Sequence, residues 1–362
     1  MSETAVSETA VSETVINETQ RNEEYLNGPS GAGHRKKHIK SSFIVVILLL
    51  LVMIYAAINT GSLNVTMSQL LRGLFAEYNP DVATVWDLRF PRIVIASLGG
   101  AALSVSGVLF QACMKNPIAD PGIIGVSAGA SFVAVLIAGL FPSLYFLTPL
   151  LAFAGGIIAC GLVYLLAFKN GLNPLRVILV GVAVNAVFTG LTQAFNGMTG
   201  GSLTGVASIA NANISQKTWD DVYIITGYVV LGLVLAWLVF YKCDLLSLSD
   251  QTARGLGLNV TTTRIAVSLI AVVLASISTA EVGVVSFIGL IVPHIARILV
   301  GSNHKVLIPF SMLGGAFLML LADTLGRTIA APYEISASIL LSIVGGPMLI
   351  ILLRRSDKTY GI

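Results

Sequence analysis

Long apolar runs recur from residue 43 to residue 353, and they constrain this chain more than any other feature. Each run has about 20 residues, enough for a helix to cross a bilayer core of roughly 30 Å. The runs are apolar on all sides, whereas the strands of a membrane β-barrel are shorter and alternate in polarity. The chain is 55% hydrophobic and only 11% charged, which excludes a soluble globule with a charged surface. The pattern therefore predicts an all-α polytopic membrane protein.

We count ten apolar runs and predict about ten transmembrane helices. In membrane proteins, lysine and arginine are more frequent in cytoplasmic loops than in outer loops. Placing both the N-terminus and the C-terminus in the cytoplasm puts most of the lysines and arginines on the inner side, so we predict this orientation. The predicted transmembrane runs are residues 43–60, 93–113, 120–141, 147–168, 175–198, 221–241, 264–281, 284–300, 307–326 and 335–353.

Residues 1–42 form a polar tail before the first run, with Ser-Glu-Thr-Ala-Val at 2–6 and again at 7–11. A short acidic repeat of this kind cannot bury enough apolar surface to fold, which predicts disorder. The tail is not a signal peptide, because the apolar run comes too late and no cleavage site follows. We therefore expect a disordered cytoplasmic tail at 1–42 and a ten-span transmembrane domain at 43–355.

Sequence motifs for catalysis are absent. There is no G-x-x-x-x-G-K-S/T phosphate-binding loop and no HExxH sequence, and the three cysteines lack CxxC spacing. We therefore expect neither catalytic residues nor a metal site in this chain. Glu281, Asp323 and Glu334 lie near the predicted outer ends of their runs. Transporters driven by an ion gradient more often carry acids near the middle of the membrane.

Three arginines fall on the predicted outer side, where positive charge is less common. Arg89 and Arg92 belong to the sequence Arg89-Phe-Pro-Arg92, and Arg327 follows Asp323 by one helical turn. One interpretation is that their side chains anchor the chain at the membrane surface. Another is that they bind carboxylates of a soluble partner, because the guanidinium group offers bidentate geometry. For Arg327, a simple intrahelical pair with Asp323 is a further interpretation.

The longest loop on the predicted inner side, residues 243–263, contains the signals of a short helix. Ser249 or Asp250 can cap its start, and Gly255 or Gly257 can end it. The loop is longer than a connection between two helices requires. A short capped helix on the cytoplasmic face fits a groove in a peripheral subunit, so we predict that this segment is a docking element.

The stretch from Gly283 to Gly301 combines a membrane-like apolar run with Pro293, His294 and Arg297. Proline removes a backbone donor from a helix, and His294 and Arg297 lie three residues apart on one face. Ionisable side chains in an apolar run usually face protein or water. One interpretation is a kinked core helix in which His294 caps the carbonyl groups that the proline leaves free.

The order of residues in this stretch is more specific than its physical properties. The sequence Gly283-x-x-x-Phe287-x-Gly289-Leu290-x-x-Pro293-His294-x-x-Arg297 resembles the permease subunits of ABC importers for iron siderophores, haem and cobalamin. The resemblance covers about residues 61–353. Further matching segments are Arg89-Phe-Pro-Arg92, Gly107 to Gln111, Asn116-Pro117, Gly125 to Ala130, Ala253 to Gly257, Asp323-x-x-x-Arg327 and Gly345-Gly346-Pro347.

The resemblance implies a subunit of the bacterial cytoplasmic membrane that pairs with a second copy of itself or with a paralogue. It also implies two cytoplasmic ATPase subunits, which bind ATP and Mg²⁺, and a substrate-binding protein outside. This chain itself then needs no cofactor and no nucleic acid. In that family, outer arginines meet acidic residues of the binding protein, a role that falls here on Arg89, Arg92 and Arg327. The coupling helix that contacts the ATPase falls on Ala253, Arg254, Gly255, Leu256 and Gly257.

In the same family the fifth span and the segment after it line and gate the pathway. Asn185, Gln193 and Asn196 are therefore candidate lining residues, and hydrogen bonding between helices is the alternative role for their side chains. Two segments depart from the family pattern. Residues 199–219 lack the sequence Trp-x-x-Gly-Ser, and Glu334 is followed by Ile-Ser-Ala-Ser in place of Ile-Pro-Val-Gly.

The function that the resemblance implies is import of an iron chelate, and we favour a ferric siderophore over haem or cobalamin. A secondary transporter driven by an ion gradient is the alternative from another class of protein. The acids near the predicted outer ends of the runs argue against that alternative, because ion-coupled transporters hold their acids deeper in the membrane.

Overall fold

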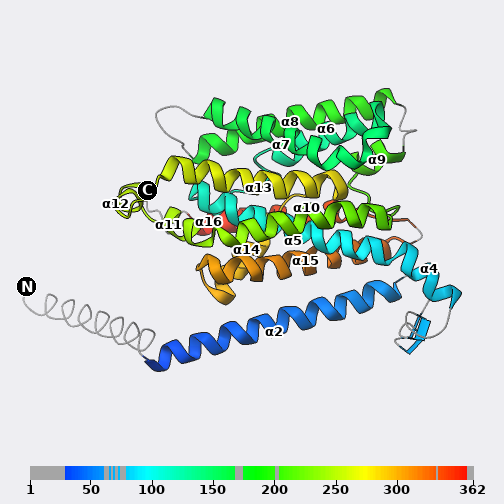
Figure 1. Ribbon diagram of the computed structural model, residues 1–362, viewed down its shortest axis with the longest axis horizontal. Coiled ribbons are helices and arrows are strands. Elements are labelled where there is room, and N and C mark those ends of the chain that lie inside the picture. The colour runs from blue at the N-terminus through cyan, green and yellow to red at the C-terminus, as the bar shows by residue number, and fades with distance from the viewer. Residues whose placement is uncertain are drawn as a thin grey trace, which may run out of the picture. The chain divides into compact units, whose positions relative to one another are not determined.

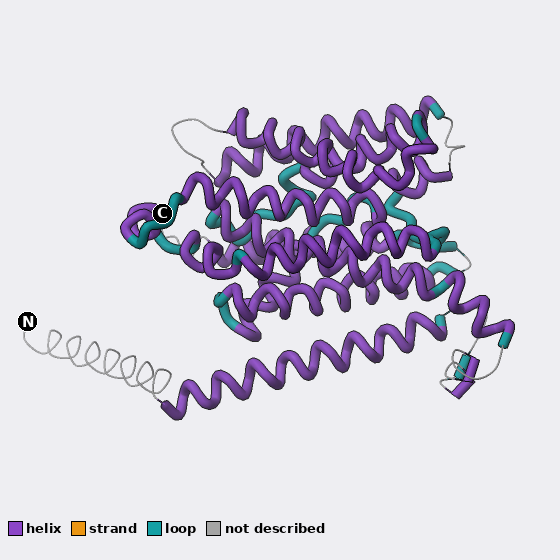
Figure 2. The backbone as a smooth tube through the Cα atoms, in the orientation of Figure 1, coloured by secondary structure: helices purple, strands orange, loops and turns teal. Residues whose placement is uncertain are grey.

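The computed structural model describes residues 29–60, 65–66, 68–69, 72–73, 79–167, 174–199, 204–331 and 333–356. Throughout these residues the chain forms helices, turns and loops, and no strand occurs in them (Figure 2). The all-α fold class is thereby confirmed. Residues 1–28 lie outside the described part of the chain, so the disorder expected there stays a prediction.

The chain divides into two compact units, Met1–Val45 and Val46–Ile362. In the first unit the described residues belong to helix α2 (Pro29–Asn59). Residues 29–42, which we expected in the disordered tail, are therefore helical. The reason is local: lysine and arginine have good helix propensity, and extending the helix of an apolar run costs far less than nucleating a new one.

The second unit is a bundle of long helices that run side by side (Figure 1). Helix α5 (Phe90–Met114) lies inside this bundle and packs against α10, α13, α14 and α15. The other helices are α4 (Pro80–Leu88), α6 (Val126–Leu140), the 3₁₀ helix η1 (Pro142–Leu147), α7 (Thr148–Ala167), α8 (Pro174–Met198), α9 (Thr204–Ala210), α10 (Trp219–Leu238), α11 (Phe240–Leu246), α12 (Asp250–Gly255), α13 (Val260–Val282), α14 (Ile288–Val300), α15 (His304–Ile329) and α16 (Ala337–Ser356).

Each of the ten predicted apolar runs lies on one of these helices. In the part of the chain that the structure describes, 7 helices are long and apolar enough to cross a membrane. Three further apolar helices are shorter, at Val126–Leu140, Ile288–Val300 and Ala337–Ile351. The polytopic character of the chain is confirmed, and the side of the membrane on which each end lies stays a prediction.

Two of the shorter helices begin later than their apolar runs. α6 begins at Val126 rather than at residue 120, and α14 begins at Ile288 rather than at residue 284. The backbone just before them is left-handed, with φ of 88° at Gly125 and 72° at Phe287. A right-handed helix cannot continue through such residues, so apolar composition alone placed these helix starts too early.

Glycines bring the central helices into backbone contact. A Cβ atom at Gly100 would lie 2.2 Å from the carbonyl oxygen of Gly315, and one at Gly107 would lie 2.1 Å from that of Gly289. Small residues allow membrane helices to approach this closely, which strengthens their packing. These contacts join α5 to α15 and to α14.

Replacing Gly107 by valine is expected to lower the thermal unfolding midpoint of the purified protein by roughly 5 °C or more, because the new atoms meet backbone that cannot move aside. The control is Gly161→Val on α7, since a Cβ atom at Gly161 meets nothing within 4 Å. Differential scanning fluorimetry in detergent measures both midpoints. Equal shifts in the two variants would contradict the packing role of Gly107.

Candidate translocation pathway and partner surfaces

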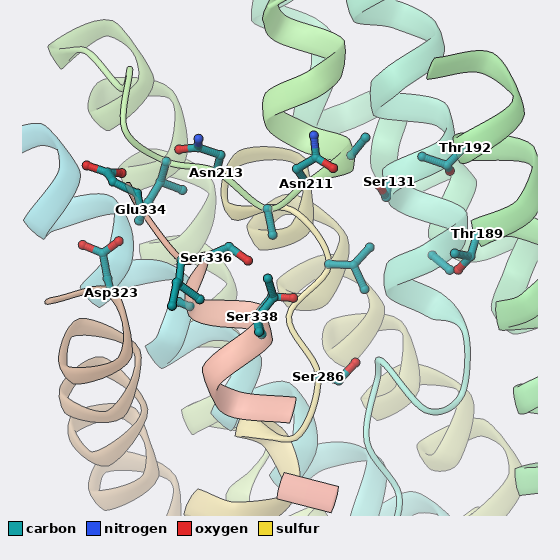
Figure 3. A pocket seen from close by; sticks show the side chains of 18 of the residues that line it. Ser131, Thr189, Thr192, Asn211, Asn213, Ser286, Asp323, Glu334, Ser336 and Ser338 are labelled. Carbon is teal, nitrogen blue, oxygen red and sulfur yellow. The ribbon is translucent and has the colours of Figure 1, made fainter. Parts of the chain in front are cut away.

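Polar side chains gather around a space of about 530 Å³ in the second unit, which we call the polar cavity (Figure 3). Its walls come from α6, α8, the segment after α9, the segment between α13 and α14, and the start of α16. Asp323 and Glu334 lie at one side of the cavity, and Ser131 and Thr192 lie at the other. Nearly half of its lining residues have uncharged polar side chains: Ser131, Thr189, Thr192, Gln193, Asn211, Asn213, Ser286, Ser336 and Ser338. Such a wall exchanges hydrogen bonds with water or with a polar solute.

The break between α13 and α14 shapes one wall of the polar cavity. Gly283 follows the last residue of α13 with a φ of 73°, which stops the helix. A Cβ atom at Gly283 would lie 2.5 Å from the Cα atom of Ala212, so the segment after α9 packs directly against this glycine. Glycine alone satisfies both the backbone angle and the close contact. Residues 211–214, which we call the strap, are held against the break in this way.

The three lining residues predicted from the sequence all lie on α8, but only Gln193 lines the polar cavity. The side-chain oxygens of Asn185 and Asn196 are buried, and neither has a hydrogen-bond partner among the described residues. The alternative role in hydrogen bonds between helices is therefore not seen for these two oxygens. A role of the three residues in transport stays a prediction.

Two further residues of α8, Thr189 and Thr192, line the polar cavity and were not predicted. A signal for them was present in the sequence. Asn185, Thr189, Thr192 and Asn196 are spaced by four, three and four residues, which places them along one face of a helix. The lining residues outside α8 carried no comparable signal, because they come from loops and helix ends that are far apart in the chain.

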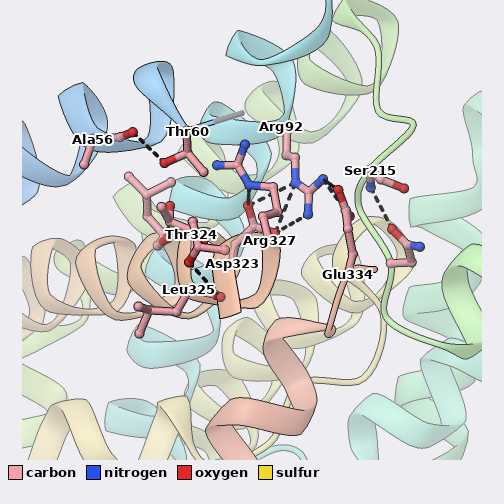
Figure 4. Close-up of polar contacts among 12 residues, drawn as sticks. Ala56, Thr60, Arg92, Ser215, Asp323, Thr324, Leu325, Arg327 and Glu334 are labelled. Atoms are coloured by element: carbon pink, nitrogen blue, oxygen red, sulfur yellow. Dashed lines mark hydrogen bonds and ion pairs between the residues drawn. The ribbon is translucent and has the colours of Figure 1, made fainter. Parts of the chain in front are cut away.

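A buried arginine forms the charged end of the polar cavity (Figure 4). Arg92, at the start of α5, has 7% of its surface exposed. Its Nε and Nη2 atoms donate to the carboxylate of Asp323 at 2.9 to 3.1 Å, and its Nη1 atom donates to Glu334 at 3.0 and 3.1 Å. One guanidinium group thus joins α5 to the end of α15 and to the linker before α16.

The three outer arginines therefore differ in their surroundings. The Nε atom of Arg327 lies 3.5 Å from Asp323, which confirms the predicted intrahelical pair. Arg89 donates to the carbonyl group of Ile58. A carboxylate of a partner protein can reach Arg92 only if Asp323 or Glu334 first releases the guanidinium group. In this conformation Arg92 therefore connects elements within the chain. Docking of a binding protein at Arg89 and Arg327 stays a prediction.

A second space, of about 670 Å³, also borders the strap, and Lys217 is among its lining residues. The ammonium group of Lys217 lies 2.6 Å from Glu281 and 3.2 Å from Asp221, and Tyr145 donates to Asp221 as well. Burial alone would lower the pKa of Lys217, but the two carboxylates outweigh burial and raise it. Lys217 therefore remains charged. Its ion pairs connect the segment that follows the strap to α13 and α10. Neither pair was predicted; Lys217 and Asp221 are four residues apart, whereas Lys217 and Glu281 are 64 residues apart in the chain.

At the predicted cytoplasmic end, α12 has the capping that the sequence predicts. The hydroxyl of Ser249 accepts the backbone N–H of Thr252 at 3.1 Å, and the helix ends at Gly255. Of the predicted coupling residues, Ala253 is buried and anchors the turn, whereas Arg254, Gly255, Leu256 and Gly257 are exposed. Leu256 is 61% exposed and so presents an apolar side chain at the surface of the turn. Contact of this turn with an ATPase stays a prediction.

Asp250, the first residue of α12, fixes this helix to the bundle. Its carboxylate lies 2.6 Å from Lys115, just after α5, and 2.9 Å from Arg264 on α13. The hydrogen bond from Lys115, assisted by Arg264, lowers the pKa of Asp250 below its ordinary value. The carboxylate is therefore ionised at neutral pH, and α12 is tied to the ends of α5 and α13.

The stretch around Pro293 differs from its predicted arrangement. α14 runs unbroken from Ile288 to Val300 with Pro293 inside it. The carbonyl group of Gly289, four residues before the proline, has no N–H to accept from Pro293, and the side-chain amide of Gln111 donates to it instead, at 2.9 Å. The other end of Gln111 accepts from Arg297 at 2.5 Å. A residue of α5 therefore satisfies the Gly289 carbonyl group, and a capping role of His294 stays a prediction.

Comparison with known proteins supports the assignment to a transporter. Residues 48–355 match the FecCD transport family. The chain is 42% identical over 323 residues to the protein named "Probable heme-iron transport system permease protein IsdF" of Staphylococcus aureus strain MSSA476, a match that covers 89% of this chain and 98% of that protein. The protein of the same name from strain Newman is also 42% identical over 323 residues.

Two solved structures are similar in fold. A chain assigned to the metal-chelate type of ABC transporter, in an inward-facing conformation, has a TM-score of 0.72 and 26% identity and covers 87% of this chain and 99% of its own length. PsaBC from Streptococcus pneumoniae, in complex with a Fab, has a TM-score of 0.54 and 18% identity and covers 79% of this chain and 95% of its own length. The second likeness shows the fold alone.

The family match extends over all ten apolar segments, and the residues around Pro293 that carry the resemblance lie at the packed centre of the bundle. The chain therefore belongs to the FecCD transport family of ABC importer permeases and is a multi-pass protein of the bacterial cytoplasmic membrane.

Proposed function

We propose that this chain forms one half of the pathway of an ATP-driven importer for iron chelates. The observation that carries the proposal is the 42% identity, over 98% of their length, to proteins named as haem-iron permeases. On this ground we now place haem ahead of the ferric siderophore that we favoured from the sequence. A second permease subunit would supply the other half of the pathway, with two ATPase subunits inside and a binding protein outside.

The lining of the polar cavity supports a ferric siderophore as the second candidate substrate, after haem. Its lining carries many hydroxyl and amide groups, and Arg92, the one cation among its described lining residues, is already paired with two carboxylates. The described lining also contains no histidine, methionine, cysteine or tyrosine to bind iron directly. Whichever chelate passes, its iron would remain with the chelator, and the wall would contact only the chelator's own groups.

The ion pairs at both ends of α5 and α13 provide a route by which an ATPase would move the helices that line the pathway. A force on α12 reaches Lys115 and Arg264 through Asp250, and so reaches the inner ends of α5 and α13. At their opposite ends these helices carry Arg92 and Glu281, beside the polar cavity and the strap. Because helices transmit displacement along their length, movement of α12 would shift the far wall of the pathway by rigid-body motion.

Replacing Leu256 by aspartate is expected to reduce ATP-dependent transport at least tenfold. An unpaired carboxylate in a buried contact costs more than roughly 1.4 kcal/mol, which corresponds to a factor of ten. The assay is uptake into proteoliposomes that contain the chain, its co-purifying ATPase and its binding protein. The control is Thr261→Asp, which adds the same charge at an exposed position of the first turn of α13. Equal uptake in the two variants would argue against docking at α12.

The same proteoliposomes separate the candidate substrates. Haem and a ferric hydroxamate are supplied with the binding protein, and uptake of each is compared with and without ATP inside. Preference for haem supports the first candidate, and preference for the hydroxamate supports the second. Uptake that follows an imposed ion gradient and continues without ATP would refute the importer proposal in favour of a secondary transporter.

A further inference from the structure

A third space, of about 450 Å³, lies beside α12 and is lined mainly by polar side chains. We call it the basic cavity. Its lining comes from the end of α5, the segment between α11 and α12, the end of α14 and the start of α15. Several of its side chains can donate hydrogen bonds without regard to protonation, among them Lys115, Asn116, Arg297 and Ser302. None of the lining residues that the structure describes is acidic.

Arg297 carries a charge that no described carboxylate balances. Its one hydrogen bond among the described residues goes to the neutral side chain of Gln111, and no ion pair of Arg297 is found in that part of the chain. A guanidinium group has five N–H donors, so most of them remain free to bind a ligand. A partly buried cation without a counter-charge is costly, and an anion in the adjacent cavity would remove that cost.

Other donors face the same space. The ammonium group of Lys115 donates to the carbonyl group of Leu248 and to Asp250, which leaves one of its three N–H groups for another acceptor. The side-chain oxygen of Asn116 accepts the N–H of Ile118, so its amide nitrogen is the end that remains available. Lys115 and Asn116 follow α5, whereas Arg297 lies on α14, so these donors approach the cavity from two different elements.

His304 is a deeply buried polar side chain of the lining, with 4% of its surface exposed. Its Nδ1 atom lies 2.6 Å from Asp244, and its Nε2 atom is buried with no hydrogen-bond partner among the described residues. The carboxylate of Asp244 can only accept, so Nδ1 carries a hydrogen and Nε2 becomes a donor when the ring is protonated. Asp244 and Asp250 are the nearby acids, and each is already paired with a cation or an imidazole. Neither carboxylate is paired with Arg297, whose positive charge therefore has no direct counter-ion among the described residues.

We propose that the basic cavity binds a phosphate-type oxyanion, supplied either by the headgroup of an anionic lipid or by free phosphate. A tetrahedral oxyanion has acceptors in every direction, which suits donors that converge from four elements, and arginine is the preferred cation for such groups. The bound anion would contact both Arg297 and Lys115. It would so connect α14 with the ion pair between Lys115 and Asp250 that holds α12. The site would thereby stiffen the segment that α12 presents to its partner.

The test uses the full chain purified in detergent without other subunits. Inorganic phosphate is titrated against chloride at constant ionic strength, and the thermal unfolding midpoint is recorded. Phosphate is expected to raise the midpoint of the wild type, and Arg297→Gln is expected to weaken the apparent affinity at least tenfold. The matched control is Lys305→Gln, which removes an exposed cation at the start of α15 that does not line the cavity. The control is expected to respond as the wild type does.

A second arm distinguishes the source of the phosphate. The chain is placed in nanodiscs of phosphatidylglycerol or of phosphatidylcholine, without free phosphate. A higher midpoint in phosphatidylglycerol that Arg297→Gln removes identifies a lipid headgroup, whereas a response to free phosphate alone identifies a soluble anion. Because Arg297 also binds Gln111, a second variant, Ser302→Glu, places a carboxylate in the cavity and leaves that contact intact. It is expected to abolish the response.

Two results would overturn the proposal. One is a wild type that responds neither to phosphate nor to the anionic lipid. The other is a pair of variants, Arg297→Gln and Ser302→Glu, that respond as strongly as the wild type. Stabilisation of the wild type by the ATPase subunit alone, with no effect of either phosphate source, would assign the cavity to an acidic side chain of that partner and would also overturn the proposal.

Discussion

Replacing Arg92 by methionine is expected to lower the free energy of unfolding by roughly 3 kcal/mol, because buried Asp323 loses the cation that donates hydrogen bonds to it and keeps only the longer pair with Arg327 at 3.5 Å. Asp323 is 3% exposed in its side chain, so water cannot replace the lost partner. Glu334 is 39% exposed and would be solvated after the change, so its pair with Arg92 adds little to this figure. The expected effect is therefore carried almost entirely by Asp323. Unfolding in mixed detergent micelles measures it.

Two further variants separate this explanation from a general loss of packing. The double variant Arg92→Met/Asp323→Asn removes the buried charge together with its partner and is expected to recover a large part of the lost stability. Arg72→Met, which removes an exposed arginine, is expected to change stability by no more than about 0.5 kcal/mol. A double variant that is no more stable than Arg92→Met would contradict the electrostatic explanation.

Replacing Lys217 by methionine is expected to have an effect of similar size, roughly 3–5 kcal/mol, because one buried cation balances two carboxylates. The side chains of Glu281 and Asp221 are 3% and 7% exposed, so neither can be solvated in place. In addition, the segment that follows the strap would lose its ion pairs with α10 and α13, so the strap would move more freely. The variant is therefore expected to be both less stable and more mobile in the strap, which lines both cavities.

Opening of the strap can be measured by cysteine labelling. Ile214 is 3% exposed, so a cysteine at this position is expected to react slowly with a soluble maleimide in an otherwise unchanged chain and markedly faster in the presence of Lys217→Met. The native cysteines, Cys113, Cys160 and Cys243, are buried and give a low background. Lys305→Met is the control for the loss of a lysine. Unchanged labelling in the Lys217 variant would show that the strap is held by packing against Gly283 and not by this ion pair.

The features that were predicted correctly from the sequence are local ones. An apolar run of about 20 residues determines a membrane helix without reference to the rest of the chain. The capped turn at α12 likewise follows from Ser249, Gly255 and the few residues between them. The pair of Asp323 with Arg327 lies within one helical turn. In each case the interacting residues are neighbours in the sequence, so their spacing alone specifies the contact.

The features that could not be predicted depend on residues far apart in the chain. Arg92 meets Asp323 and Glu334 only because α5, α15 and the linker before α16 end at the same place. The starts of α6 and α14 were placed too early because composition does not reveal a left-handed residue such as Phe287. Most of the lining of the polar cavity could not be predicted either, because it comes from loops and helix ends that are far apart in the chain. Only the polar face of α8 was indicated by the spacing of residues in the sequence.

The contact between Gln111 and Gly289 has a consequence for how this family can change in evolution. Pro293 leaves a carbonyl group vacant, and Gln111 fills it from another helix. A relative with an ordinary residue in place of Pro293 would supply its own N–H to that carbonyl group, and glutamine would no longer be required at the position of Gln111. The two positions are therefore expected to vary together among relatives, and the position of Arg297, which binds the other end of Gln111, to vary with them.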